Sequence, residues 1–165
     1  MLSENLAHYL DLYNKWSSYT PEKDGVMIAY ASIYGNTKKA AELLYDKLKA
    51  KNVDVIITDL ARCDMSKAIS DAFAYGKLVL ATPTYNADVF PFMRTFIEGL
   101  TERNYQKRTV AFIENGAWAP MAAKVMAGMF EKSKELNILD KTVKITCALN
   151  DASAAQIDEL AEELA

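Results

Sequence analysis

Histidine and cysteine are scarce in this chain of 165 residues. The single histidine, His8, excludes a histidine-rich metal site, and it leaves no histidine for a Ser-His-Asp catalytic system beyond the N-terminal segment. The two cysteines, Cys63 and Cys147, lie far apart in the sequence. Lone cysteines of this kind are typical of reduced core residues, so we expect a cytoplasmic protein without disulfides and without metal ligands.

Long apolar runs and an excess of basic charge are absent as well. The 19 Lys and Arg residues are outnumbered by 22 Asp and Glu residues, which argues against nucleic acid or an anionic membrane surface as a partner. No apolar stretch approaches the ~20 residues of a membrane span. Residues 1–5 lack the basic and apolar segments of a signal peptide. With 51% hydrophobic residues, the chain has enough apolar material for one domain with a real core.

Short apolar runs alternate with helical patterns from residue 26 onward. The runs are continuous, as expected of strands buried on both faces, and cover residues 26–31, 53–59, 78–82, 109–114 and 142–149. This alternation predicts an α/β fold, namely a three-layer α/β/α sandwich around a five-stranded parallel sheet. A common strand order for such a doubly wound sheet is 2-1-3-4-5. The last helix is predicted to open with a capping box over residues 153–156.

Residues 3–16 carry apolar side chains at helical spacing, which predicts an amphipathic helix with Leu6, Tyr9, Leu10, Tyr13 and Trp16 on one face. The polar stretch that follows, residues 17–25, contains turn-forming residues and is interpreted as a connector. Residues 1–24 are therefore expected to form an N-terminal helix and linker, and residues 25–165 the main domain. The pattern leaves open whether the helix covers that domain or links it to another one.

Three loops of the predicted sheet differ from the others. They follow the first, third and fourth strands and cover residues 32–37, 83–90 and 115–120, whereas the loops at residues 61–64 and 150–152 are plain. In doubly wound sheets, ligands bind at the carboxyl ends of the strands, where the winding reverses. The three loops therefore predict a ligand crevice at that edge of the sheet.

The first of these loops has the features of a phosphate site at the start of a helix. Ser32, Asn36 and Thr37 offer polar side chains, and exposed backbone N–H groups and the positive end of a helix dipole accompany them. With one glycine, the loop is neither a Walker A loop nor a dinucleotide fingerprint. Lys38 and Lys39 begin the helix where acidic residues are normally preferred, which fits a bound anion. The alternative is that Thr37 is an ordinary N-cap and that the lysines lie on a solvated face.

Tyr85 and Trp118 lie in the two loops that border this phosphate site. Two flat aromatic side chains there suit a planar, polycyclic ligand, although partly buried packing is the alternative for Trp118. Asp88 and Glu114 form a conceivable pair of carboxylates, but we expect each at a solvated loop end. The seven methionines are mostly at helical spacing and are interpreted as core residues.

The loop Ser32-Ile33-Tyr34-Gly35-Asn36-Thr37 resembles the phosphate loop of flavodoxins. Combined with Pro83-Thr84-Tyr85-Asn86, Phe90-Pro91 and Glu114-Asn115-Gly116-Ala117-Trp118-Ala119-Pro120, it is similar to the flavodoxin-like domain of flavodiiron proteins. The resemblance covers residues 26 to about 165. The preceding helix also resembles the linker that joins this domain to a metallo-β-lactamase-like di-iron domain.

The resemblance implies FMN as the cofactor, bound by residues of all three loops. The implied cofactor-binding residues are Ser32, Ile33, Tyr34, Gly35, Asn36 and Thr37 in the phosphate loop, Pro83, Thr84, Tyr85, Asn86 and Ala87 along the ribityl chain and ring edge, and Asn115, Gly116, Ala117 and Trp118 beside the isoalloxazine ring. No catalytic residue and no metal ligand are implied within this chain.

The resemblance also implies partners. In flavodiiron proteins, FMN passes electrons to a di-iron centre that reduces dioxygen or nitric oxide, and a rubredoxin-like protein or a reductase is the expected electron donor. The domain that would hold the di-iron centre is missing from this sequence. The chain is therefore expected to be the electron-transfer half, with the di-iron domain in the same parent chain or in a dimer mate.

Two other functions stay open at this point. One is a stand-alone flavodoxin-like NAD(P)H:quinone reductase, and the other is a binding module of the same fold that has lost FMN. The sequence departs from the flavodoxin pattern at Tyr34, where many flavodoxins have a threonine, and at Asn86-Ala87-Asp88, where they often have a glycine.

Overall fold

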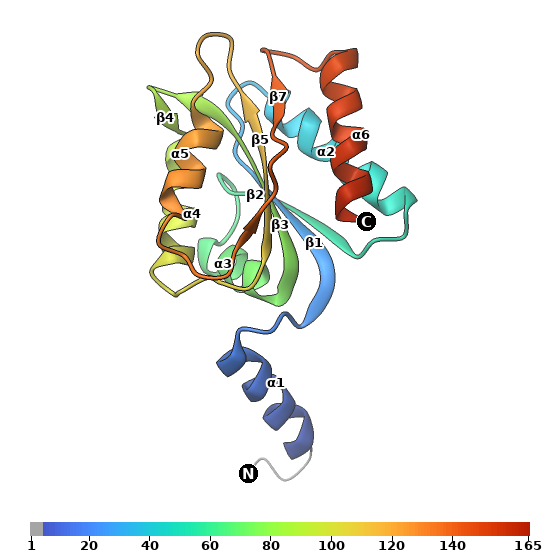
Figure 1. Ribbon diagram of the computed structural model, residues 1–165, viewed down its shortest axis with the longest axis vertical. Coiled ribbons are helices and arrows are strands. Elements are labelled where there is room, and N and C mark those ends of the chain that lie inside the picture. The colour runs from blue at the N-terminus through green and yellow to red at the C-terminus, as the bar shows by residue number, and fades with distance from the viewer. Residues whose placement is uncertain (1–4) are drawn as a thin grey trace.

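The computed structural model of the chain describes residues 5–165. The helices are α1 (Leu6–Ser18), α2 (Asn36–Ala50), α3 (Met65–Ala74), α4 (Pro91–Thr101), α5 (Ala122–Met129) and α6 (Asp151–Leu164). The strands are β1 (Lys23–Tyr30), β2 (Val55–Asp59), β3 (Tyr75–Tyr85), β4 (Asp88–Val89), β5 (Thr109–Asn115), β6 (Asn137–Ile138) and β7 (Val143–Ile145). Strands and helices alternate as predicted (Figure 1).

The sheet has the predicted parallel topology. Its hydrogen-bonded order is β2-β1-β3-β5-β6, which is 2-1-3-4-5 when the parallel strands alone are counted. Two short strands share the fifth position of the sheet, because β5 pairs with β6 near its start and with β7 near its end. The strand predicted over residues 142–149 is therefore too long. It ends at Ile145, and Cys147 turns the chain with a φ of 66°.

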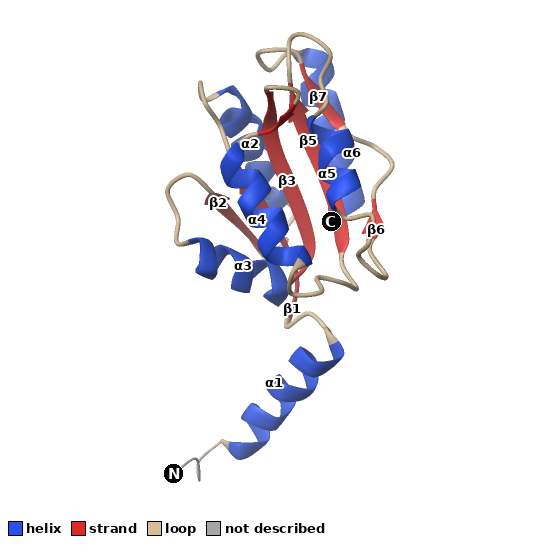
Figure 2. Cartoon of the chain, turned by 90° about the vertical axis from the view of Figure 1, so that its left-hand side faces the viewer, coloured by secondary structure: helices blue, strands red, loops and turns tan. Residues whose placement is uncertain are grey.

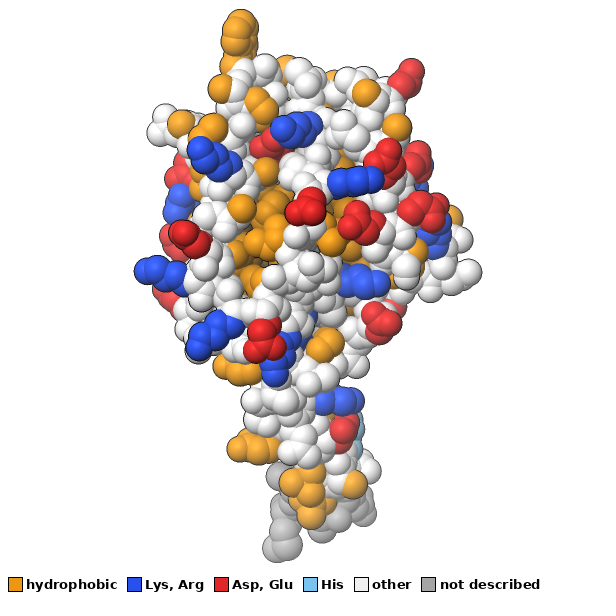
Figure 3. Space-filling model, viewed as in Figure 1, with side chains coloured by type: hydrophobic (Ala, Val, Ile, Leu, Met, Phe, Trp, Pro, Cys, Tyr) orange, Lys and Arg blue, Asp and Glu red, His pale blue; other side chains and the backbone are white. Residues whose placement is uncertain are grey.

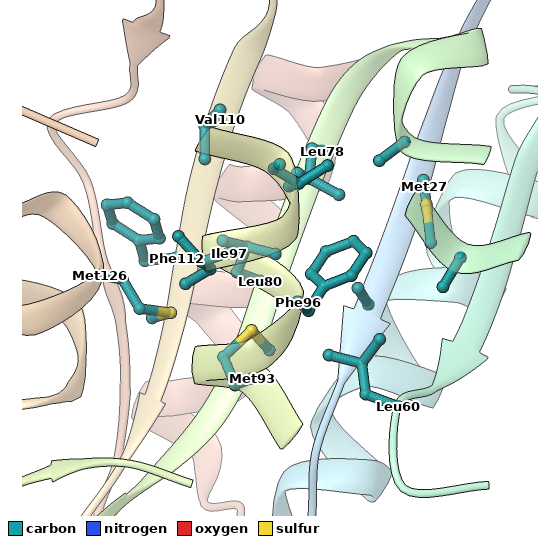
Figure 4. Packing of buried hydrophobic residues seen from close by; sticks show 14 of the residues in the cluster. Met27, Leu60, Leu78, Leu80, Met93, Phe96, Ile97, Val110, Phe112 and Met126 are labelled. Carbon is teal, nitrogen blue, oxygen red and sulfur yellow. The ribbon is translucent and has the colours of Figure 1, made fainter. Parts of the chain in front are cut away.

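Helices cover both faces of the sheet and form two separate cores (Figure 2). Helices α3, α4 and α5 pack on one face, around Leu78, Leu80 and Phe96 (Figure 4). Helices α2 and α6 pack on the other face, around Val79 and Ile113. The central strands are buried on both sides, which explains their continuous apolar runs. The predicted three-layer sandwich is confirmed.

The predicted loop over residues 83–90 is largely regular structure. Strand β3 continues to Tyr85, the chain turns at Asn86 and Ala87, and β4 returns antiparallel with Thr84 opposite Val89. Both turn residues have positive φ, 52° and 59°, as a tight hairpin turn requires. The prediction missed this hairpin because Ala87 stands where such turns usually have glycine.

Two predicted helix starts are wrong by a few residues. Helix α2 begins at Asn36 with Gly35 as its N-cap residue, so Thr37 is not the cap. Helix α6 begins at Asp151, and its capping box joins Asn150 and Ser153 rather than residues 153–156. The Asn150 side chain accepts from the Ser153 N–H and the Ser153 hydroxyl accepts from the Asn150 N–H, both at 2.9 Å.

Helix α1 projects from the amino-terminal edge of the sheet, away from the rest of the molecule (Figure 1). It has no buried residue, and the predicted apolar face, from Leu6 to Trp16, is 47–65% exposed. Figure 3 shows exposed hydrophobic patches on this helix. The helix does not cover the domain, so that alternative is wrong. The start predicted at residue 3 lies outside the described residues.

Within residues 5–165, no helix combines the length and the apolar character that a membrane span needs. The same part of the chain contains no cluster of His, Cys, Asp and Glu that could hold a metal ion. Cys63 and Cys147 are both free thiols. Cys63 is half-buried and packs against the core, whereas Cys147 is exposed, so the expectation of a core residue is wrong for Cys147.

Candidate functional site

A hollow of about 210 Å³ lies at the carboxyl edge of the sheet, where the three predicted loops meet. It is lined by Ser32, Ile33, Tyr34, Asn36, Thr37, Pro83, Thr84, Asn115, Gly116, Ala117 and Cys147. Ten of these residues belong to the set predicted from the sequence. Larger hollows of about 470 and 610 Å³ lie at the opposite edge beside Tyr19. Another, of about 350 Å³, also touches the first loop, at Ser32, Ile33 and Gly35, but Asp59 lines it as well.

The first wall of the hollow is the loop between β1 and α2. The Ser32 hydroxyl accepts from the Gly35 N–H at 3.1 Å, and Gly35 has a φ of 85°, which glycine adopts without strain. No side chain among the described residues caps α2. Its first N–H groups, which lack partners within the helix, therefore face the hollow together with Thr37, which is 2% exposed.

The electrostatics of this wall favour an anion. No acidic residue lines the hollow among the described residues, and the positive end of the α2 dipole lies against it. Lys38 and Lys39 point outward, and the Lys38 ammonium lies 3.6 Å from Glu42 one helical turn away. The solvated interpretation of the lysines is correct, and the backbone supplies the attraction.

The second wall is the end of β3, which also fixes the start of α5. The Thr84 hydroxyl accepts from the N–H groups of Met121 and Ala122 at 3.0 and 3.2 Å. The Glu114 carboxylate accepts from the Ala123 N–H at 3.0 Å. Glu114 is 3% exposed, so the expectation of a solvated loop end is wrong. Both side chains serve as caps for α5 from the neighbouring strands.

Asp88 has a different role from the one considered in a carboxylate pair. It forms a two-pronged ion pair with Arg94 on α4, whose guanidinium lies 2.5–3.1 Å from both carboxylate oxygens. The Arg94 hydrogen bonds hold the pKa of Asp88 below its ordinary value. Asp88 and Glu114 are thus engaged with separate partners, which disfavours paired acid–base catalysis.

The third wall is the loop after β5, which presents Trp118 to solvent. The Gly116 N–H donates to the Ile145 carbonyl at 3.0 Å, and the α5 caps hold the far end of the loop. A Cβ on Gly116 would lie 3.3 Å from Pro120, so the two ends of the loop are in close contact. Trp118 is 91% exposed, and the interpretation of this residue as packing is wrong.

Five predicted residues lie outside the hollow: Gly35, Tyr85, Asn86, Ala87 and Trp118. Tyr85 is half-exposed on the β3–β4 hairpin, with its ring edge-on to Phe90 at 5.4 Å. Cys147 lines the hollow but was not predicted, because the strand that it follows was expected to continue to residue 149. Cys147 lies at the hollow because β7 already ends at Ile145.

The sequence profile of the family described as Flavodoxin matches residues 28–159, which covers all three walls. The chain belongs to the flavodoxin family. An uncharacterised protein of Methanocaldococcus jannaschii is 30% identical to this flavodoxin-family chain over 159 residues, which are 94% of the chain and 40% of the relative. An anaerobic nitric oxide reductase flavorubredoxin of an Enterobacter species is 27% identical over 116 residues, 68% of the chain and 24% of the relative.

Solved structures give the same fold. Rubredoxin oxygen:oxidoreductase of Desulfovibrio gigas superimposes with a TM-score of 0.88 at 18% identity, over 96% of this chain and 39% of that one. The flavodiiron protein of Giardia intestinalis gives 0.88 at 16% identity, over 96% and 39%. A flavodoxin from the Archaea gives 0.72 at 19% identity, over 85% and 95%. The chain thus spans about two fifths of the length of its flavodiiron neighbours and nearly all of a flavodoxin.

Membership in the flavodoxin family implies a flavin cofactor, and the hollow fits a flavin that carries a phosphate. The uncapped N-terminus of α2 and the buried Thr37 hydroxyl are the donors that a phosphate needs. Tyr34, which lines the hollow, and Trp118, which follows the lining residue Ala117, are 90% and 91% exposed, so both rings are free to meet an aromatic ligand.

Proposed function

We propose that this chain is an FMN-binding electron-transfer domain of the flavodiiron type. The observation that carries the proposal is the start of α2, whose N–H groups have no cap and open into a hollow between two aromatic-bearing loops. When bound, FMN would supply the chemistry, because its ring system accepts and releases electrons. The protein supplies binding, orientation and the electrostatic environment.

The residues of each wall would bind a different part of the cofactor. Ser32, Asn36 and Thr37 would hold the phosphate together with the α2 N–H groups, and Thr84 would lie beside the ribityl chain. The loop from Asn115 to Trp118 would flank the ring. With no acidic side chain at the hollow, the doubly negative phosphate meets no repulsion among the described lining residues.

Flavin binding tests this proposal directly. We expect the purified chain to bind FMN, with a yellow colour and quenched flavin fluorescence, and to bind riboflavin more weakly because the phosphate contributes charge-assisted hydrogen bonds. A chain that binds neither flavin at micromolar concentrations would contradict the proposal and would favour a module of the same fold without a cofactor.

The partners follow from the relatives. Flavodiiron neighbours are more than twice as long as this chain, so we propose a metallo-β-lactamase-like di-iron domain as the electron acceptor, in the same parent chain or in a dimer mate. A rubredoxin-like protein or a reductase would be the donor. We further propose residues 1–24 as the linker, residues 25–165 as the FMN domain, and a cytoplasmic location.

A second candidate is an NAD(P)H:quinone reductase. The outward positions of Tyr34 and Trp118 leave the hollow open, as an enzyme that binds its substrates over the flavin requires. Steady oxidation of NAD(P)H by the FMN-loaded chain alone, with a quinone as acceptor, would favour this enzyme. Turnover that appears only after a reductase is added favours the electron carrier.

A further inference from the structure

Asn115 joins three segments that are far apart in the sequence. It is the last residue of β5 and is 9% exposed. Its amide nitrogen lies 3.4 Å from the Thr37 hydroxyl oxygen on α2 and 3.3 Å from the carbonyl oxygen of Cys147 after β7. One side chain thus connects the phosphate loop with the segment on the other side of the hollow.

The contact with the Cys147 carbonyl shows which end of the Asn115 side-chain amide faces that carbonyl. A carbonyl oxygen only accepts hydrogen bonds, so it is the NH₂ group of Asn115 that faces it. The second hydrogen of the same nitrogen is directed at Thr37 Oγ1, which makes the hydroxyl an acceptor in this contact. No described residue accepts a hydrogen bond from that hydroxyl, so its proton is available toward the hollow.

We propose that Asn115 is a positioning residue that selects for the phosphate of the flavin. By donating to Thr37, it turns the hydroxyl proton toward the phosphate site, where the N–H groups of α2 already point. Riboflavin lacks the phosphate and gains nothing from this orientation. The inference rests on the proposed function, and it assigns to Asn115 a role in discriminating FMN from riboflavin rather than in stacking against the ring.

The variant N115D reverses the contact with little change in shape. A carboxylate accepts from Thr37, which draws the hydroxyl proton away from the site, and it places a negative charge beside the phosphate and against the Cys147 carbonyl. The preference for FMN over riboflavin should fall by about tenfold or more, since charge-assisted hydrogen bonds are stronger than neutral ones. The affinity for riboflavin should fall by less than the affinity for FMN, because riboflavin carries no phosphate to meet the new charge.

The experiment measures the dissociation constants of FMN and riboflavin for the full chain and its variants by fluorescence titration. N115L is the uncharged variant of similar size, and its FMN preference should fall by about threefold because only the orienting hydrogen bond is lost. T37V should lose the preference as well, and T37S, which keeps the hydroxyl, should retain it. If N115D does not fold, N115L carries the same test.

Two outcomes overturn the inference in distinguishable ways. If the unmodified chain binds neither flavin, the proposed function fails and this role fails with it. If the unmodified chain prefers FMN, but N115D and N115L leave that preference unchanged or weaken both flavins equally, Asn115 is a structural residue only. In that case the proposed function stands without it.

Discussion

At the scale of single residues, the side chains around the site range from hydrogen-bonded within the fold to almost fully exposed. The side-chain oxygens of Thr84 and Glu114 accept hydrogen bonds from the start of α5. The rings of Tyr34 and Trp118, in contrast, are almost fully exposed. A residue that is 91% exposed contributes little to folding, so its effect belongs to ligand binding.

Trp118→Ala should therefore separate binding from stability. We expect FMN binding to weaken by about 1–3 kcal/mol, in the range of bases stacked on aromatic side chains. The free energy of unfolding without flavin should be unchanged. Trp16→Ala is the matched control, because the other tryptophan lies on α1, far from the hollow. Equal FMN affinity in the two variants would show that Trp118 takes no part in the site.

Ala87→Gly should stabilise the protein. Ala87 has a φ of 59° in the β3–β4 turn, a conformation that costs a residue with a Cβ about 1–2 kcal/mol. The expected gain in the free energy of unfolding is about 1 kcal/mol, reduced by the greater freedom of glycine in the unfolded chain. Ala117→Gly, an exposed loop position without positive φ, is the control and should gain nothing in a urea titration.

At the scale of elements, neighbouring strands and helices fix one another through side chains that the sequence does not pair. The β3–β4 hairpin is held to α4 by the Asp88–Arg94 ion pair, and α5 is capped from β3 and β5. The strands and helices themselves follow from apolar periodicity. Their ends were predicted less well. Gly35 and Asn150 precede helices and bond to Ser32 and Ser153, three residues away, and Cys147 follows the end of β7 with a positive φ.

The hairpin contact should make stability depend on pH. Because the folded-state pKa of Asp88 lies below the unfolded value near 3.8, the contribution is present above that value and is lost as the pH falls through the folded-state pKa. Asp88→Asn should lower Tm at pH 7, and the difference in Tm from the parent chain should narrow as the pH falls below 3.8. A gap in Tm that is as large at pH 2.5 as at pH 7 would contradict this assignment.

At the scale of the whole molecule, the hollow formed by the three loops and helix α1 lie at opposite edges of the sheet (Figure 1). The joint between α1 and the rest is polar. Arg108, which is 4% exposed, donates to the carbonyls of Tyr19 and Tyr75, and Lys107 donates to the Ser18 carbonyl at 3.0 Å. The body is therefore expected to fold without the helix that extends from it.

Removal of residues 1–18 tests that independence. The free energy of unfolding should change by less than about 1 kcal/mol, and FMN affinity should be unchanged, because α1 buries no residue. Arg108→Met is the contrasting variant, since it leaves buried carbonyls without a donor and should cost about 3 kcal/mol or more. A truncated chain that no longer binds FMN would contradict the expectation that FMN binding is independent of α1.

The sequence by itself determined the parallel sheet, its strand order and the three loops that meet at its carboxyl edge. Those features depend on apolar periodicity and on chain connectivity, which are local or topological properties. The tertiary structure alone decided that Trp118 is exposed, that Glu114 is buried as a cap, and that Cys147 reaches the hollow. These depend on which groups meet across the sheet, and partners distant in the sequence leave no trace in a local pattern.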